Sequence, residues 1–502
     1  MPDDRVARTV RRARFVRLPA ARPPRPLVLL VLVGAILSLS WDVALPPFQG
    51  PDEDTHFAYV QHLAETGKLP SPSSGGTAYS SEEEQVLVSL NLLPLIGDVN
   101  ARPGWGAADM RIWHGFERKL TSSERENGAG PNPIAKNPPL YYATMAAPYR
   151  LLLWLPLLKR LFVLRLFNAL CYLATIILSW LIAGELFAVR WKQVLATGVV
   201  ALEPQLSFMS AVVNADNLLI ALTTAVLLAS LRLVTRGPSL RRVLIAGALT
   251  GAAVLTHGRG LVNVPVLALA LVVSWALHRP ARRQAVSGAA AAAGPVGAAL
   301  LVYLGIRGGS GGGLYGGQIS QLNSGSRFGF RQFLYSIYEF YFPRLRSMPP
   351  RIGPEYGYKQ VFIETFYGSF GSLEVTFKER IYDVLQVLSA IGLGGLYTTI
   401  VLRRRVLLRA WPIVIVLLGL LVVNVGFLHY VSYRSLLSNG GTDPLIVGRY
   451  LLPMVSLFGI AIAFTVGSLP RRAGPVVAAL ILASGVLLTL GGLGLTAVRF
   501  YA

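Results

Sequence analysis

The sequence is poor in cysteine and in charge. Its 502 residues include one cysteine, Cys171, which lies in an apolar stretch, so an intrachain disulfide framework is excluded. Only 14% of the residues are charged, whereas 53% are hydrophobic. A soluble protein of this length needs a charged exterior and shows separate domains joined by polar linkers. The shortage of charge therefore favours a protein whose exterior faces lipid.

Acidic residues are scarcer than basic ones, at 25 against 47, which gives a net charge of +22. A basic excess of this size is also typical of proteins that bind nucleic acid. Here Lys and Arg occur in short clusters between apolar runs, and no aromatic-rich or Gly-rich RNA-binding motif is present. This distribution is what the positive-inside rule produces in membrane proteins. We expect a lipid bilayer as a partner, and no nucleic acid.

Apolar stretches of about 20 residues, enough to cross roughly 30 Å of hydrocarbon, recur along the chain. The first follows a run of arginines, and a signal peptide is the alternative interpretation. Its apolar core is long for a signal peptide and no clear small-residue cleavage site follows, so we interpret it as a retained span. The predicted fold is an all-α polytopic membrane bundle of eleven spans. They cover residues 27–46, 163–187, 194–213, 217–234, 243–257, 260–278, 285–306, 381–402, 410–430, 448–468 and 474–495.

One further apolar run, at 138–158, decides the topology. If it crossed the membrane, the basic turns after it would face outward; if it lies along the interface, all of them face the cytoplasm together with the basic N-terminus. Pro138, Pro148 and Arg150 interrupt the run, and a charge buried in lipid costs several kcal/mol. We therefore predict an interfacial helix in a bacterial cytoplasmic-membrane protein, with the N-terminus in the cytoplasm and the C-terminus outside.

This topology divides the chain into four parts. The glycine run at 308–313 lacks the Lys-Ser/Thr pair of a phosphate-binding loop, so we expect a flexible linker there. The parts are a basic cytoplasmic segment at 1–26, a core of seven spans at 27–306 that contains a large first outer loop at 47–162, a Gly-rich and aromatic outer loop at 307–380, and four C-terminal spans at 381–502.

The most informative polar motif is Pro51-Asp52-Glu53-Asp54-Thr55-His56, directly beyond the first span. Three consecutive carboxylates at a membrane surface are solvated, or are paired with a cation or a metal. The acids suit the first turn of a helix, whose dipole favours them. A helix over 52–66 would also place Asp52 and His56 on one face as an acid–base or metal-binding pair. Both interpretations stay open.

A second polar motif, Asn214-Ala215-Asp216-Asn217, lies at the outer end of the third span. It either caps the next helix or joins Asp52 in one site, because the predicted topology puts both on the same side. Basic residues on that side are few and run against the orientation bias. They either extend to lipid headgroups or bind a lipid phosphate, which arginine grips through two nitrogens. These residues are Lys136, Arg165, His257, Arg259 and Arg449.

The order of these motifs resembles the GT-C superfamily of multispanning glycosyltransferases and, within it, a largely uncharacterised bacterial family. Enzymes of the superfamily use polyprenyl-phosphate sugars. The sequence departs from the pattern at Asp54, a third acid, and at Val447, where we expect a glutamine. The resemblance rests on Pro51-Asp52-Glu53-x-x-His56, Asn137-Pro138-Pro139-Leu140-Tyr141-Tyr142, Phe366-Tyr367-Gly368-Ser369-Phe370-Gly371 and Gly448-Arg449-Tyr450-Leu451-Leu452-Pro453.

The resemblance implies a membrane enzyme that moves a sugar from a polyprenyl-phosphate donor to a glycan, lipid or protein acceptor of the cell envelope, on the outer face. It implies Asp52 or Glu53 as the general base. A divalent cation, Mg or Mn, is the one cofactor to expect, with Asp52, Glu53 and His56 as its ligands. The acceptor-binding or supporting residues would be His56, Asn214 and Asp216. The donor phosphate would be held by Lys136, Arg165, Arg259, Arg449 and Tyr450, which would stabilise charge on the leaving group.

A transporter or flippase for lipid-linked glycans is the alternative, and a glycan polymerase is a variant of the enzyme hypothesis. Transporters carry ionisable residues or broken helices near the middle of the bilayer. Nearly all acids of this chain lie in loops, and Glu203 in the third span is the exception. The distribution of acids therefore favours an enzyme that works at the membrane interface.

Overall fold

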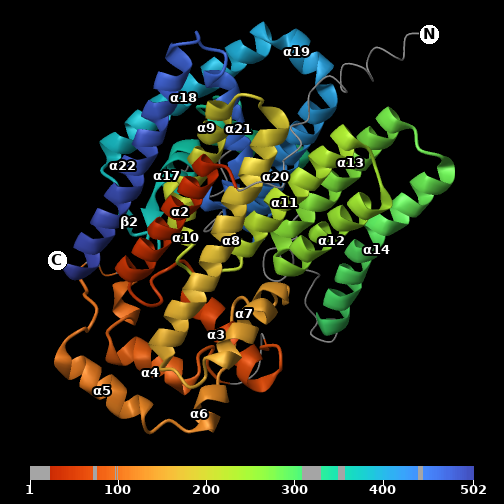
Figure 1. The fold of residues 1–502 in the computed structure, drawn as a ribbon. Helices are drawn as coiled ribbons and strands as arrows, with labels where there is room; N and C mark the ends of the chain where they lie inside the picture. The colour runs from red at the N-terminus through yellow and green to blue at the C-terminus, as the bar shows by residue number, and fades with distance from the viewer. Residues whose placement is uncertain are drawn as a thin grey trace.

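The computed structural model describes residues 23–71, 76–96, 98, 100–307, 329–348, 357–438 and 445–502. The predicted basic segment up to Arg22 and the glycine run 308–313 lie outside the described residues. The described chain is almost entirely helical (Figure 1). Its two strands, β1 (Ser369–Phe370) and β2 (Val375–Thr376), form one short antiparallel pair. The predicted all-α membrane fold is confirmed.

Nine segments of the described chain are long and apolar enough to cross a membrane. Two predicted spans are shorter: α12 (Leu240–Thr256) has 17 residues, and the span at 194–213 is broken before Pro204 into α9 (Arg190–Ala201) and α10 (Pro204–Met209). The count of eleven spans therefore stays a prediction. The nine are α2 (Arg25–Ala44), α8 (Leu157–Leu186), α11 (Asp216–Arg236), η2 (Gly258–Val262) with α13 (Asn263–His278), α14 (Arg282–Arg307), α18 (Glu379–Leu402), α20 (Trp411–Ser438), η5 (Gly448–Met454) with α21 (Val455–Val466), and α22 (Ala473–Tyr501).

The first loop folds into short helices between α2 and α8. Helix α7 (Leu140–Leu151) has 12 residues. At 1.5 Å per residue it is about 18 Å long, too short for the hydrocarbon core. This agrees with the predicted interfacial helix at 138–158. The other helices of the loop are α3 (Glu53–Thr66), α4 (Ser81–Ser89), η1 (Leu93–Leu95), α5 (Ala107–Glu117) and α6 (Ser122–Glu126).

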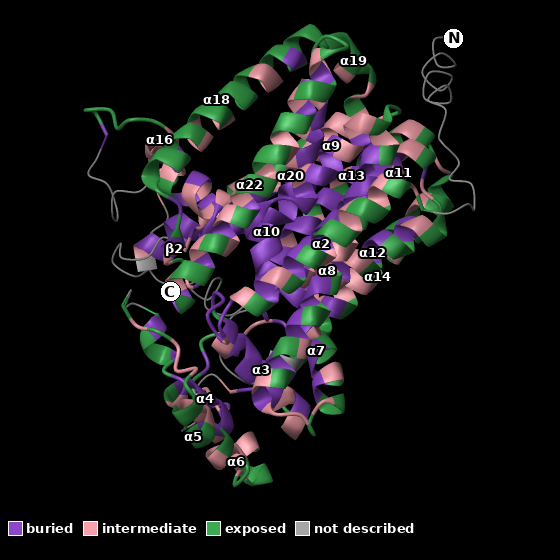
Figure 2. Ribbon diagram, turned by 60° about the vertical axis from the view of Figure 1, so that its left-hand side comes forward, coloured by how far each residue is buried: buried purple, intermediate pink, exposed green. Residues whose placement is uncertain are grey.

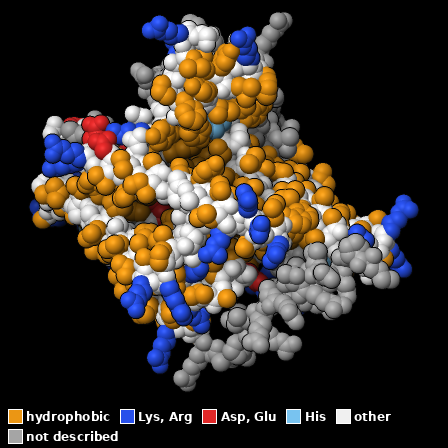
Figure 3. Space-filling view, turned by 90° about the horizontal axis from the view of Figure 1, so that it is seen from above, with side chains coloured by type: hydrophobic (Ala, Val, Ile, Leu, Met, Phe, Trp, Pro, Cys, Tyr) orange, Lys and Arg blue, Asp and Glu red, His pale blue; other side chains and the backbone are white. Residues whose placement is uncertain are grey.

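The C-terminus lies on the same side of the bundle as this loop. Arg499 in α22 donates to the backbone oxygens of Ala101 at 2.8 Å and Asp98 at 2.9 Å. Helices α4 to α6 lie at one end of the bundle in Figure 1, and α19 (Arg404–Arg409) lies at the other. Figure 3 looks onto the α19 end, where Lys and Arg side chains stand out around the rim and acidic ones are few. The molecule thus separates the first loop from the basic turn at α19, and which end faces the cytoplasm stays a prediction.

Burial is highest in the middle of the bundle (Figure 2). In the apolar windows of the spans, 67% of the α11 residues and 61% of the η5–α21 residues are buried, against 11% in α18 and 17% in α22. Helices α18 and α22 therefore present apolar side chains outward, as lipid-facing helices do. The two most buried segments begin near Asp216 and at Gly448, so the polar motifs of the sequence start on the most firmly packed elements.

The described part of the second outer loop packs behind η5. A Cβ atom on Gly448 would lie 2.5 Å from the backbone nitrogen of Phe366, so this close approach requires glycine. The two motifs that begin at Phe366 and Gly448 therefore meet in the fold. The loop contains α16 (Phe330–Tyr341), the π-helical turn η4 (Lys359–Glu364) and α17 (Thr365–Tyr367).

Candidate active site

The first-loop motif is folded against the segment that leads into α11. A Cβ atom on Gly50 would lie 2.4 Å from a methyl carbon of Val212, so glycine is needed at this contact as well. Asn214 donates through Nδ2 to the backbone oxygen of Pro51 at 3.0 Å, and its Oδ1 accepts the backbone N–H of Asp216 at 2.9 Å. Asn214 thus joins the two polar motifs, which lie on one side of the bundle.

Asp52 and Glu53 are neighbours in sequence but lie in different environments. Asp52 precedes the first residue of α3 and has a φ of 57°, in the left-handed region that is rare for residues other than glycine and is common at functional sites. Its side chain is 57% exposed and accepts a hydrogen bond from Nη2 of Arg449 at 2.9 Å. Glu53 is fully buried. Of the two carboxylates, Asp52 is the one open to a substrate.

Glu53 forms a closed ion pair with Arg165. Nε of Arg165 lies 2.8 Å from Oε1 and Nη2 lies 2.6 Å from Oε2 of Glu53. Oε1 also accepts the backbone N–H of Val213 at 3.0 Å. Nη1 and Nη2 of Arg165 donate to the backbone oxygens of Leu45 and Pro46, both at 3.0 Å. The structure therefore departs from the expected roles of both residues, because each buried charge is already satisfied by the other.

Two other buried arginines keep open hydrogen-bonding edges. Arg449 is 9% exposed and gives Nη2 to Asp52, and its Nε and Nη1 form no hydrogen bond within the described chain. Arg259 is 6% exposed and gives Nη2 to Asp216, and its Nε and Nη1 are likewise without a bond among the residues described. Burying polar N–H groups without an acceptor is unfavourable, so an anion placed at these edges would be stabilised.

Tyr450 contacts both open arginines. The guanidinium carbon of Arg259 lies 4.0 Å from the centroid of the Tyr450 ring, and that of Arg449 lies 5.5 Å from it. Both distances fit a cation–π contact. The ring thus brings the open edges of the two arginines into one neighbourhood, beside Asp52.

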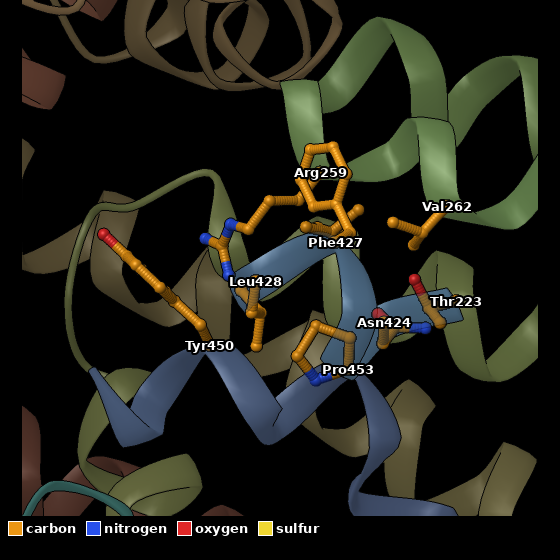
Figure 4. A pocket seen from close by; sticks show the side chains of 9 residues that line it. Thr223, Arg259, Val262, Asn424, Phe427, Leu428, Tyr450 and Pro453 are labelled. Carbon is orange, nitrogen blue, oxygen red and sulfur yellow. The ribbon is translucent and has the colours of Figure 1, made fainter. Parts of the chain in front are cut away.

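A pocket adjoins Arg259 where α11, η2, α20 and η5 meet (Figure 4). It contains about 240 Å³ of empty space. Figure 4 shows the guanidinium of Arg259 turned toward Tyr450, with apolar side chains around the stem of the arginine. The pocket is therefore largely apolar with a cationic end. It is lined by Leu219, Thr223, Arg259, Val262, Asn424, Phe427, Leu428, Tyr450 and Pro453.

His56 lies one helical turn after Asp52 and is 4% exposed. Its Nδ1 is 2.9 Å from the hydroxyl oxygen of Tyr142, and the two rings stack with centroids 5.7 Å apart. Burial lowers the pKa of His56 to about 4, although the carboxylates of Asp52 and Asp216 oppose this shift. His56 is therefore uncharged at neutral pH.

The three expected metal ligands do not converge on a cation. Glu53 is bonded to Arg165, and Nδ1 of His56 is bonded to Tyr142, so Asp52 lacks two of its expected co-ligands. Across the part of the chain that the structure describes, no group of three or more His, Cys, Asp or Glu side chains is arranged to hold a metal ion. These residues do not fit the divalent-cation site that the resemblance implied.

Lys136 is half-buried, and its backbone oxygen accepts the hydroxyl of Tyr303. Its neighbour Asn137 donates through Nδ2 to the hydroxyl of Tyr142 at 3.1 Å. Asn137 and Tyr142 were not among the candidate site residues, although the motif that contains them was visible in the sequence. What the sequence does not show is that this motif packs against His56.

The sequence matches the family described as "Predicted membrane protein (DUF2142)" over residues 33–458. No match is found among the curated proteins. Two solved structures are similar in fold. ArnT from Cupriavidus metallidurans bound to undecaprenyl phosphate is 15% identical, with 94% of this chain and 74% of that chain covered and a TM-score of 0.45.

The second similar structure is the oligosaccharyltransferase AglB from Archaeoglobus fulgidus in complex with an inhibitory peptide and a dolichol-phosphate. It is 11% identical, with 94% of this chain and 55% of that chain covered and a TM-score of 0.38. Similarities of this size do not establish an activity, which has to be inferred from the site itself.

Proposed function

The chain belongs to the DUF2142 family of predicted membrane proteins, and we propose that it is a glycosyltransferase that takes a sugar from a polyprenyl-phosphate donor on the outer face of the membrane. The observation that carries this proposal is the pair of open, buried arginines next to the exposed carboxylate of Asp52. A phosphate attached to a lipid supplies the anion that the arginine edges lack.

The donor phosphate would bind between Arg449 and Arg259. Each arginine offers Nε and Nη1, and guanidinium groups bind phosphate oxygens through two parallel hydrogen bonds. The largely apolar pocket beside Arg259 would accept the first part of the polyprenyl chain. Lys136, next to Asn137, would add positive charge near the same place.

In the proposed reaction a hydroxyl oxygen of the acceptor attacks C1 of the donor sugar. The proton of that hydroxyl passes to the carboxylate of Asp52, and the C1–oxygen bond to phosphate breaks, leaving its electron pair on the polyprenyl phosphate. Negative charge grows on this leaving group, where Arg449 and Arg259 would stabilise it. Because Arg449 already holds Asp52, it would align the base with the leaving group.

The remaining candidate residues would position this machinery. Arg165 and Glu53 fix the turn that precedes α3, and Asp216 orients Arg259. Asn214 holds the two motifs together. On this proposal the acid that the sequence pattern left undecided is Asp52, and Glu53 supports it by holding its backbone in place.

The test is sugar transfer by the purified protein in proteoliposomes. The donors would be undecaprenyl phosphates that carry radiolabelled hexoses or pentoses, and the acceptor would be an isolated bacterial cell-envelope fraction. Asp52→Asn should lower transfer by about 10²–10⁴-fold, the range for loss of a general base. Glu84→Gln, a matched change of an exposed acid in the same loop, should leave transfer unchanged.

Equal activity of Asp52→Asn and the wild type would contradict the proposal. Movement of labelled lipid across the bilayer without loss of its sugar would favour the flippase alternative instead. A glycan polymerase would transfer sugar repeatedly to its own product, which the length of the labelled glycan would show.

A further inference from the structure

His56 is held in an aromatic stack at the start of the first loop. Its ring stacks on Tyr142 at an interplanar angle of 15° and meets Tyr141 edge-on at 88°. On the far side, Tyr142 stacks on Tyr59 with centroids 3.7 Å apart. The backbone N–H of His56 donates to the backbone oxygen of Asp52 at 3.0 Å, which fixes the spacing between these two residues at one helical turn. The ring therefore has little freedom to move.

The hydrogen bonds of Tyr142 determine which nitrogen of His56 carries the proton. The hydroxyl oxygen of Tyr142 accepts from Asn137 and lies within hydrogen-bond distance of Nδ1 of His56. Tyr142 is fully buried, and within the described chain its hydroxyl proton has no acceptor other than Nδ1. If Nδ1 carried a proton, the hydroxyl proton of Tyr142 would be buried without a partner, which is unfavourable. Tyr142 therefore donates to Nδ1, and the ring proton is on Nε2.

This arrangement keeps a neutral N–H donor among charged groups. Burial lowers the pKa of His56 to about 4, so the ring stays neutral across the neutral pH range. Nε2 forms no hydrogen bond with any described residue and is absent from the fully buried polar atoms that lack partners. The titratable and charged groups around His56 are Asp52, Asp216, Arg449, His257, Tyr59, Tyr141 and Tyr142.

We propose that Nε2–H of His56 donates to a hydroxyl oxygen of the saccharide next to the hydroxyl that Asp52 deprotonates. Residues four apart on a helix have Cβ atoms about 5–6 Å apart. A carboxylate and an N–H donor at this spacing match two neighbouring hydroxyls of a sugar ring, one of which gives a proton while the other accepts a hydrogen bond. The inference rests on the proposed function, and it favours a glycan acceptor over a protein or simple lipid acceptor.

The protonation state is tested without any substrate, by NMR of isotope-labelled histidine in the full-length protein in nanodiscs. The chain has six histidines, and the His56 signal is assigned by its loss in His56→Gln. We expect Nε2 to be protonated and the ring to be neutral at neutral pH. In Tyr142→Phe the bond that stabilises the neutral ring is lost, so the two tautomers should mix and the titration should move to higher pH. A proton on Nδ1, or a charged ring at neutral pH, would overturn the proposal.

The substrate contact is tested with two variants in the transfer assay described above. In His56→Gln the side-chain amide reaches the place of Nε2 and keeps an N–H donor, whereas in His56→Asn the amide reaches only the place of Nδ1. Loss of one neutral hydrogen bond predicts an increase of about 3- to 10-fold in the acceptor KM of His56→Asn, with the donor KM unchanged. His56→Gln should restore most of the acceptor affinity.

The two Michaelis constants distinguish the possible sources of the hydroxyl. An increase confined to the acceptor KM assigns the hydroxyl to the acceptor; an increase confined to the donor KM places it on the transferred sugar and overturns the acceptor assignment. Equal constants for the Gln and Asn variants would remove His56 from substrate contact. If the wild type transfers no sugar at all, the proposed function fails and the substrate role fails with it, while the NMR result still decides the tautomer.

Discussion

Arg165 and the pair Arg449 and Arg259 are buried to a similar degree, with 3%, 9% and 6% of their surfaces exposed, but they use their hydrogen-bonding groups differently. Arg165 bonds to Glu53 and to backbone oxygens through all three nitrogens. The other two arginines each use Nη2 for one carboxylate and leave Nε and Nη1 without a bond in the described chain. Burial alone therefore does not explain the open edges.

A third buried arginine shows that closure is common in this protein. Arg160 donates through Nε to the backbone oxygen of Leu155 at 3.0 Å and through its other nitrogens to Glu65, Tyr149 and Glu82. It joins α8 to the first loop as Arg165 does. The contrast indicates that closed groups hold the loop on the bundle, and that open groups mark the place where a ligand completes the bonding.

The largest effect on stability should come from opening a closed group. Arg165→Ala leaves the carboxylate of Glu53 buried and unpaired, which should destabilise the protein by about 3–5 kcal/mol. Thermal unfolding in detergent should show this as a large fall in the unfolding temperature. The double variant Glu53→Leu with Arg165→Met removes both charges and should recover much of the loss. A single variant as stable as the wild type would show that the closed pair does not hold the loop.

At the open site the same kind of change should affect transfer and not stability. Arg449→Lys keeps the positive charge but loses the planar set of donors that binds phosphate through two bonds. We expect transfer to fall by about 10- to 100-fold, the loss of one or two hydrogen bonds to a charged group, with the unfolding temperature little changed. Full activity of the lysine variant would mean that charge alone is needed at this position.

A smaller effect is expected at the ring between the two arginines. Tyr450→Leu removes two cation–π contacts worth about 1 kcal/mol, which corresponds to roughly a 5-fold rise in the donor KM. Tyr450→Phe keeps the ring and should behave nearly as the wild type. If the Phe variant is impaired as strongly as the Leu variant, the hydroxyl is the important group and the cation–π account is wrong.

The smallest effect concerns a buried acid that is in neither class. Glu83 is fully buried, and neither of its carboxyl oxygens has a hydrogen-bond partner in the described chain. Burial and the nearby carboxylates of Asp54 and Glu82 raise its pKa well above the usual 4.5. Because the pKa is higher in the folded state, the stability that neutral Glu83 contributes is lost as pH rises. Glu83→Gln should therefore gain in unfolding temperature over the wild type with increasing pH; a difference independent of pH would contradict this.

The sequence was sufficient to place the candidate site on one side of the bundle. Apolar runs and the bias of short basic turns predicted that 138–158 does not cross, and α7 is indeed too short to do so. The proximity of Asp52 to Arg449 and of Asp216 to Arg259 follows from the same topology. These features depend on periodicity and charge, which are local in the sequence.

The partners of individual charges could not be predicted in the same way. Glu53 and Arg165 are 112 positions apart, and the turn that directs Glu53 inward depends on the left-handed backbone of Asp52. Glu203, the one acid predicted inside a span, accepts the backbone N–H of Leu206 and so caps α10. Its role as a helix cap depends on the break before Pro204, which an apolar pattern does not reveal.

The central claim is that the open arginines, and not the closed ones, hold a lipid phosphate. It is tested most directly by binding of undecaprenyl phosphate to the purified protein in nanodiscs, measured for the wild type, Arg449→Gln, Arg259→Gln and the control Arg232→Gln, whose arginine pairs with Glu185. We expect binding to weaken by about 10- to 100-fold in the two site variants and to stay unchanged in the control. Unchanged binding in both site variants would contradict the account.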